Sequence, residues 1–223
     1  MSLLRSALGY AAIESVGSRI FDVITLWIVL NTLPTSDLAN FGLATSALFF
    51  FNFIFLAPET ALLRNQKQWS AAGVLSEQIS AFISFSVFKI GIHLLLAAIV
   101  VLSIGVDHWL VYAIIFSAIT QQIQAAEISR IYMRMELMQR KVAKFEIYSK
   151  SALFACCLIL FKDSSLELYF GIYFIWSVIV SLLWMHSLSK FVQFKYLGVE
   201  DSVKLVWKAL NGFSLWSHIV GIV

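Results

Sequence analysis

The sequence predicts an all-α fold, a polytopic transmembrane helical bundle of six helices plus the start of a seventh, with a cytoplasmic N-terminus. Hydrophobic residues make up 60% of the 223-residue chain and charged residues only 13%, which excludes an ordinary soluble domain. Long uncharged apolar runs recur along the chain. Basic residues gather in alternate gaps between these runs, so the net charge of +3 indicates topology and gives no support to nucleic-acid binding.

Apolar runs close to the ~20 residues that an α-helix needs to cross a hydrocarbon core define the expected spans. The first, about Gly9–Leu33, is long enough but carries charges, and the second is Leu38–Pro58. Pro58 lacks an N–H and is expected to kink or end the second helix. The later spans are Ile90–Val106, Trp109–Ala126 with an extension through Arg134, Phe145–Phe161, Leu168–Ser189, and the start of a seventh at Ala209–Val223.

The orientation of the bundle is predicted from the basic residues in the gaps. The gaps Thr35–Asn40, Gly105–His108 and Lys162–Leu166 contain a single basic residue, Lys162. Under the positive-inside rule, the richer gaps and the N-terminus lie in the cytoplasm, and Arg64–Ser80 is expected to be a short polar linker there. The basic residues on that side are Arg5, Arg64, Lys67, Arg130, Arg134, Arg140, Lys141, Lys144, Lys190, Lys195, Lys204 and Lys208.

Two domains follow from these spans. Residues 1–190 are expected to form a six-helix transmembrane lobe, and residues 191–223 a cytoplasmic loop and the start of a second lobe. Cys156 and Cys157 are adjacent, and a disulfide between neighbours would be strained, so we interpret them as packing residues without a metal, redox or cofactor site. The sequence contains no phosphate-binding loop, zinc-protease motif or nucleophile elbow, and no enzyme activity is expected.

The first span carries an unusual polar stripe. Glu14, Arg19 and Asp22 fall on one side of a helix, and apolar residues occupy the other side. Each charge at the centre of a span costs about 2.5–3.5 kcal/mol, against a gain of about 0.3–0.6 kcal/mol per apolar residue. The three charges nearly cancel the driving force for insertion, so this stripe must face other protein or water.

Other expected spans carry charges at similar depths. Glu59 ends the second span, Lys89 precedes the third, and Glu146 and Lys150 form an i,i+4 pair at the start of the fifth. Together with the first helix, these groups predict a water-filled cavity that opens toward the cytoplasm. Simpler interpretations stay open: carboxylates near the interface can be solvated, the lysines can extend to the headgroups, and Arg19 and Asp22 can form a structural ion pair.

Three segments carry a resemblance to a known family. They are Ser15–Thr25, with the pattern S-x-G-S-R-I-F-D-x-I-T, then A-P-E-T-A-L-L-R at Ala57–Arg64, and the basic segment R-M-E-L-M-Q-R-K-V-A-K-F at Arg134–Phe145. With these segments the chain resembles, over its whole length, the polysaccharide and O-antigen flippases of the multidrug/oligosaccharidyl-lipid/polysaccharide exporter superfamily. That resemblance implies two six-helix lobes around a central cavity, of which this chain would be the N-terminal one, cut from a longer protein.

The resemblance also implies a function. Such proteins carry a lipid-linked oligosaccharide across the bacterial inner membrane by alternating access, so the expected partners are that substrate, membrane lipids and a second transmembrane lobe. Cations are needed to bind a pyrophosphate, and a guanidinium can do so with two hydrogen bonds. The candidate substrate-binding residues are Arg19, Lys89 and Lys150, and the candidate ion-coupling residues are Asp22, Glu14 and Glu59.

Two other functions fit the same residues. A cation or drug antiporter of the same superfamily would bind its substrate with the carboxylates and use Arg19 as their partner. A non-transporting assembly subunit would use its polar stripes only to hold helices together.

Overall fold

The computed structural model describes the backbone of residues 2–52, 58–160, 165–195 and 197–210, and the side chains of residues 6–48, 61–160, 165–195 and 197–209. Within these ranges the chain forms α-helices and no strand, which confirms the all-α class. The helices are α1 (Ser2–Thr32), α2 (Thr35–Asn52), α3 (Pro58–Ala71), α4 (Leu75–Ile104), α5 (Trp109–Met135), α6 (Gln139–Leu160), α7 (Leu166–Leu188) and α8 (Val199–Leu210).

Three of the described helices, α4, α5 and α7, are long and apolar enough to cross a membrane. At ~1.5 Å per residue, even the shortest of them is about 35 Å long, against a hydrocarbon core of ~30 Å. Helices α1 and α6 have comparable lengths, but charged residues lower their hydropathy. A count of spans beyond these three stays a prediction.

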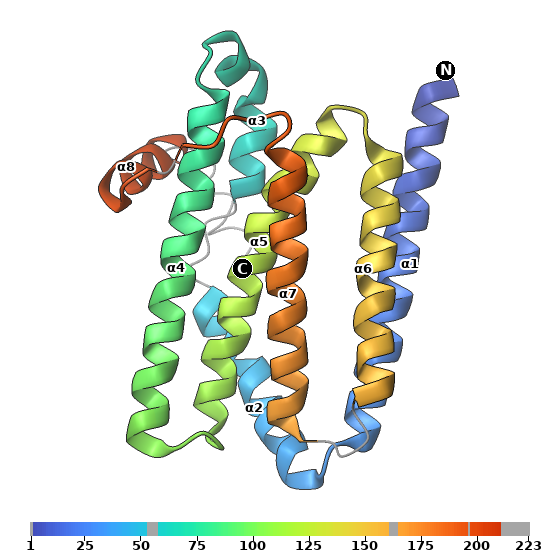
Figure 1. Ribbon diagram of the computed structural model, residues 1–223, viewed down its shortest axis with the longest axis vertical. Coiled ribbons are helices and arrows are strands. Elements are labelled where there is room, and N and C mark those ends of the chain that lie inside the picture. The colour runs from blue at the N-terminus through green and yellow to red at the C-terminus, as the bar shows by residue number, and fades with distance from the viewer. Residues whose placement is uncertain (1, 53–57, 161–164, 196, 211–223) are drawn as a thin grey trace.

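The long helices run alongside one another as two groups (Figure 1). Helix α1 packs along α6, whereas α2, α4 and α7 surround α5, and the short helices α3 and α8 pack against α4. The N-terminus, α3, the turn between α5 and α6, and α8 lie toward one end of the bundle (Figure 1). The turns that connect α1 to α2 and α4 to α5 lie at the opposite end.

Two expected loops contain helices. The prediction that Arg64–Ser80 is a linker is wrong: α3 runs to Ala71, and α4 begins at Leu75 after a turn at Gly73, whose φ of 70° favours glycine. Polar residues interrupt the apolar run before Ile90 without interrupting the helix, so hydropathy placed the third span too late.

Pro58 begins α3, a position where its missing N–H has no cost. Helix α8 lies in the expected cytoplasmic loop, and residues 211–223 of the expected seventh span lie outside the described residues.

Helix α5 is the centre of the bundle. Its residues contribute to apolar clusters on both sides, one with α3, α4 and α8 and another with α1, α2, α6 and α7. Gln122 of α5 adds polar contacts to α7: Ser177 donates to its side-chain oxygen, and Ser181 donates to its backbone carbonyl at 2.9 Å. Cys157 packs in the second cluster, as predicted, whereas the neighbouring Cys156 is exposed, and both thiols are free.

The close approach of α1 and α6 at Gly17 leads to a stability prediction. A Cβ at this position would lie 3.3 Å from Cγ1 of Ile147. Gly17→Ala is therefore expected to change the thermal midpoint little, because the isoleucine can shift, whereas Gly17→Leu is expected to lower stability by about 1–3 kcal/mol through overpacking. Thermal unfolding in detergent measures both. Gly9→Leu, where no atom lies within 4 Å, is the control, and equal losses at both glycines would contradict this packing.

Candidate functional site

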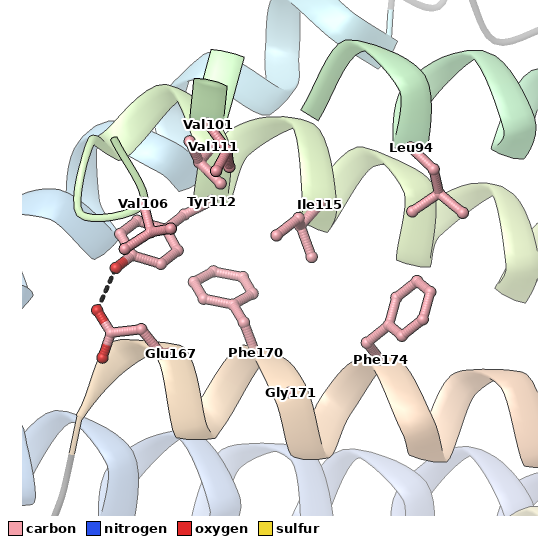
Figure 2. A pocket seen from close by; sticks show the side chains of 10 residues that line it. All are labelled: Leu94, Val101, Val106, Val111, Tyr112, Ile115, Glu167, Phe170, Gly171 and Phe174. Atoms are coloured by element: carbon pink, nitrogen blue, oxygen red, sulfur yellow. Dashed lines mark hydrogen bonds between the residues drawn. The ribbon is translucent and has the colours of Figure 1, made fainter. Parts of the chain in front are cut away.

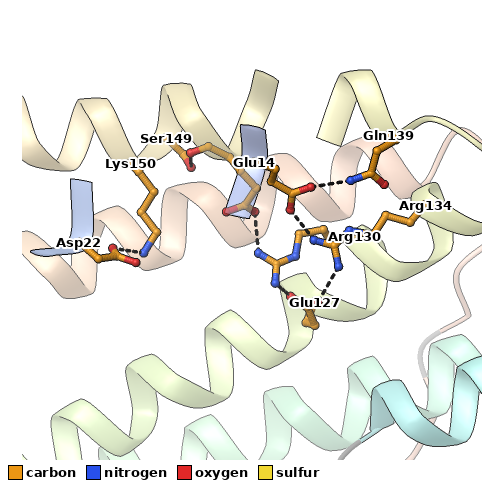
Figure 3. Close-up of polar contacts among 9 residues, drawn as sticks. Glu14, Asp22, Glu127, Arg130, Arg134, Gln139, Ser149 and Lys150 are labelled. Carbon is orange, nitrogen blue, oxygen red and sulfur yellow. Dashed lines mark hydrogen bonds and ion pairs between the residues drawn. The ribbon is translucent and has the colours of Figure 1, made fainter. Parts of the chain in front are cut away.

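The candidate site is a cavity of about 510 Å³ between α1, α5 and α6, toward the end of the bundle that holds the N-terminus. Four cations and three carboxylates line it, and Figure 3 shows most of them meeting in one network. The charged lining residues are Arg19, Arg130, Arg134, Lys150, Glu14, Asp22 and Glu146.

Arg134 connects α5 to α1. Its guanidinium forms an ion pair with Glu14, whose other carboxylate oxygen accepts a hydrogen bond of 2.7 Å from the Gln139 side chain at the start of α6. The turn between Met135 and Gln139 is short, so Arg134 at the end of α5 and Gln139 at the start of α6 both reach Glu14. Glu14 is only 5% exposed, which places this part of the first helix's polar stripe against protein.

Arg130 connects α5 to α6, one helical turn before Arg134. Its guanidinium forms an ion pair with Glu127 on the same helix and a second one with Glu146 of α6, at 3.0 Å. Glu127 also lies 3.6 Å from Arg134, so the two arginines and the carboxylates of three helices form one chain of charges (Figure 3). Such a network stabilises a buried charge because each group has an opposite charge beside it.

Lys150 forms a separate ion pair in the same cavity. Its ammonium donates to Asp22 of α1 at 2.6 Å and lies 5.0 Å from the ring centre of Trp176 on α7. The Asp22 side chain is 49% exposed and lines the cavity. Arg19 is exposed and lines the same cavity, and no ion pair joins it to another described residue.

The structure brings four of the sequence candidates together: Glu14, Arg19, Asp22 and Lys150. It does not bring Lys89 to them. That residue lies on α4, which packs on α5 at the side away from α1 and α6 (Figure 1), where its ammonium lies 5.0 Å from the ring centre of Phe85. The side chain of Glu59 lies outside the described residues.

Two same-helix pairings that the sequence left open are absent from the described ion pairs. Lys150 was expected to pair with Glu146 one turn earlier on the same helix, yet it pairs with Asp22, and Glu146 pairs with Arg130. Asp22 was open to a structural pair with Arg19 three residues away, and its partner is again Lys150. In both cases a side chain from a neighbouring helix offers better geometry than a neighbour on the same helix, whose contribution is only about 0.2–0.5 kcal/mol.

Sequence reasoning missed Arg130, Arg134 and Gln139 as site residues. It assigned the arginines to a cytoplasmic basic segment because they lie near the end of a span. A usable signal was present: Arg130 and Arg134 are four residues apart, and Glu127 lies three residues before Arg130. That spacing puts all three side chains on one helix face, which a helix entering a charged cavity requires.

Two further cavities lie in the bundle, one beside the charged cavity and one away from it. A small cavity of about 70 Å³ is lined by Arg130, Glu146 and Lys150 together with Trp176 and Val180 of α7. Nearer the other end of the bundle, a cavity of about 310 Å³ lies between α4, α5 and α7. Figure 2 shows it lined by aliphatic and aromatic side chains, with the Tyr112 hydroxyl donating to Glu167 at one end. Its polar groups pair with each other, so it offers little for binding a charged ligand.

No family model, curated protein or solved structure matches this chain.

Proposed function

We propose that this chain is a six-span lobe of a membrane transporter that flips a lipid-linked oligosaccharide across the bacterial inner membrane by alternating access. The observation that carries the proposal is the charged cavity between α1, α5 and α6. Three helices place ionised groups in a bundle whose long helices α4 and α7 are strongly apolar, and ionisable groups at such positions mark transport pathways more often than they serve structure alone. This use requires a second transmembrane lobe, or a second copy of the chain, on the open side of the cavity.

The location of the charges supports six spans. The polar stripe of α1 is the obstacle to its insertion, and Glu14 meets Arg134 while Asp22 meets Lys150. Each of these two carboxylates therefore has an opposite charge from another helix, which removes most of the cost that an unpaired charge has in lipid. Basic residues lie within α3, in the last turn of α5 and just after α7, all toward the end of the bundle that holds the N-terminus (Figure 1), and we assign that end to the cytoplasm.

The arginines suit an anionic pyrophosphate. Arg130 and Arg134 lie one turn apart, and each guanidinium can donate two hydrogen bonds to phosphate oxygens. Counting Arg19 of the cavity lining and Glu127, which contacts both arginines of α5, the cavity has four cations and four carboxylates around it. An anion therefore binds by displacing carboxylates from the arginines.

This displacement provides a route for coupling. When phosphate takes Arg134 from Glu14, the released carboxylate lies beside an anion without its former partner, a state that binding of a coupling cation stabilises. Glu14 and Asp22 are the coupling residues in this scheme. After the coupling cation has left, the two carboxylates pair again with Arg134 and Lys150, and the substrate is released. Arg19, without an ion pair among the described residues, is available to the substrate before any displacement.

A cation antiporter is the second candidate, and the exposure of the Asp22 carboxylate side chain to the cavity favours it. The two functions differ in their response to Arg19→Ala and Asp22→Asn. For a flippase, loss of Arg19 is expected to slow translocation of a fluorescent lipid-linked oligosaccharide in proteoliposomes about tenfold or more, since a charge-assisted contact is worth about 1.5–3 kcal/mol. Asp22→Asn is expected to have the smaller effect on that substrate.

The assay uses the full-length protein, with Arg140→Ala as the matched control, because Arg140 is exposed outside the cavity beside the Tyr10 ring. The opposite ranking, with Asp22→Asn abolishing export of a cationic dye and Arg19→Ala tolerated, supports the antiporter. Normal activity of both variants with both substrates would contradict a transport role for this cavity.

A further inference from the structure

An apolar groove of about 440 Å³ lies between α6 and α7. Exposed side chains from both helices line it, including Ala152, Cys156 and Leu160 of α6 and Ile175, Ile179 and Leu183 of α7. On α6 the lining extends from Phe145 to Leu160, about 22 Å at 1.5 Å per residue, which exceeds the ~15 Å of one leaflet's hydrocarbon. Its volume lies within the ~300–1,000 Å³ of ligand-binding pockets.

A small cavity of about 70 Å³ lies between this groove and the charged cavity and shares lining residues with both. Trp176 and Val180 line both the groove and the small cavity. Arg130, Glu146 and Lys150 line both the small cavity and the charged one. The three spaces therefore form a series that changes from apolar to charged across the width of α6.

Trp176 is the boundary of this series. Its indole N–H donates to the Ser149 carbonyl at 2.8 Å, and the Lys150 ammonium lies 5.0 Å from its ring centre. One side chain thus presents an apolar edge to the groove and a ring face to a cation. Because α6 packs chiefly on α1, and α7 chiefly on α5, a ligand can lie between α6 and α7 without separating either pair.

We infer that the groove between α6 and α7 holds the hydrocarbon tail of the lipid-linked substrate while its phosphate group lies at Arg130 and Lys150. The inference rests on the proposed function and adds a tail-binding subsite and a lateral route of entry to it. Charge complementarity selects the occupant: a hydrocarbon chain alone has no use for the adjoining cations, and a free sugar phosphate has none for an apolar groove. An amphiphile with one anionic end and one long chain uses both.

The test uses a polyprenyl monophosphate that carries a diazirine near the distal end of its chain. Photolysis with the full-length protein in nanodiscs, followed by peptide mapping, is expected to label the groove-lining residues of α6 and α7. Ala152→Trp fills the groove and is expected to weaken binding of this probe about tenfold, equivalent to 1.4 kcal/mol. Ala155→Trp is the matched control, since Ala155 is also an exposed alanine of α6 and lies outside the groove lining.

The outcomes separate the two proposals. One outcome is that Arg130→Gln weakens binding of the probe, Ala152→Trp does not, and the labels lie away from α6 and α7. This outcome overturns the tail subsite and leaves the flippase proposal standing. The tail subsite is also overturned if excess phosphatidylglycerol prevents labelling of the groove as effectively as unlabelled polyprenyl phosphate does. The groove would then hold an ordinary membrane lipid. Absence of any saturable binding of the probe overturns the proposed function, and the tail subsite with it. The mapping uses the wild-type protein and does not depend on how the variants fold.

Discussion

Replacement of Arg130 by glutamine is expected to abolish transport and to lower the stability of the protein by about 3–5 kcal/mol, the usual cost of removing one partner from a buried ion pair. Arg130 is the only group that contacts both Glu127 and Glu146 among the described ion pairs. Without it, the buried carboxylate of Glu146 loses its ion pair, and the half-buried Glu127 keeps only the contact of 3.6 Å with Arg134. Thermal unfolding in detergent measures the loss of stability, and translocation in proteoliposomes measures the loss of activity.

The control is Arg140→Gln, which removes an exposed guanidinium near the same end of the bundle and is expected to stay within about 0.5 kcal/mol of the wild type. A triple variant separates the two effects. Adding Glu127→Gln and Glu146→Gln to Arg130→Gln removes the unpaired charges, so stability is expected to recover while transport does not. Full transport by Arg130→Gln would show that the arginine network is structural only.

The sequence predicted which side of α1 is polar, because a stripe of charges in an apolar helix is stable only where it faces protein or water. Glu14 and Asp22 had to meet protein or water, and they do so in the cavity. The helical class followed from the same hydropathy pattern. Hydropathy alone did not find α3 and α8, because short amphipathic helices and loops share a polar composition.

Partner choice was beyond the sequence. Local spacing favours Glu146 as the partner of Lys150, but a helix neighbour contributes only tenths of a kcal/mol, so the packing of α1 against α6 decides the pair. Lys89 shows the same limit in another form. Its depth in the span was the reason to expect it at the cavity. Depth along a helix does not determine which neighbouring helix a side chain faces, and here α5 lies between α4 and α1.

Reversal of one charge in the pair between α1 and α6 is expected to have the second large effect. Asp22→Lys places two ammonium groups together where Lys150 now lies 2.6 Å from a carboxylate. Like charges ~4 Å apart repel by up to about 4 kcal/mol at an effective dielectric constant of ~20, and exposure of this position reduces that value. Transport is expected to fall at least tenfold, with a lower thermal midpoint. Lys150→Asp is expected to produce the same loss through two carboxylates.

The double variant Asp22→Lys, Lys150→Asp decides whether the pair itself matters. It restores an opposite charge across the same two helices, so the thermal midpoint is expected to return most of the way to the wild-type value. Transport is expected to recover less, because the cation then belongs to α1 and no longer lies beside the Trp176 ring at the boundary of the groove. A double variant as unstable as the single ones would show that α1 and α6 do not meet at these residues. Complete recovery of transport would show that the position of the cation on α6 has no role in binding the substrate.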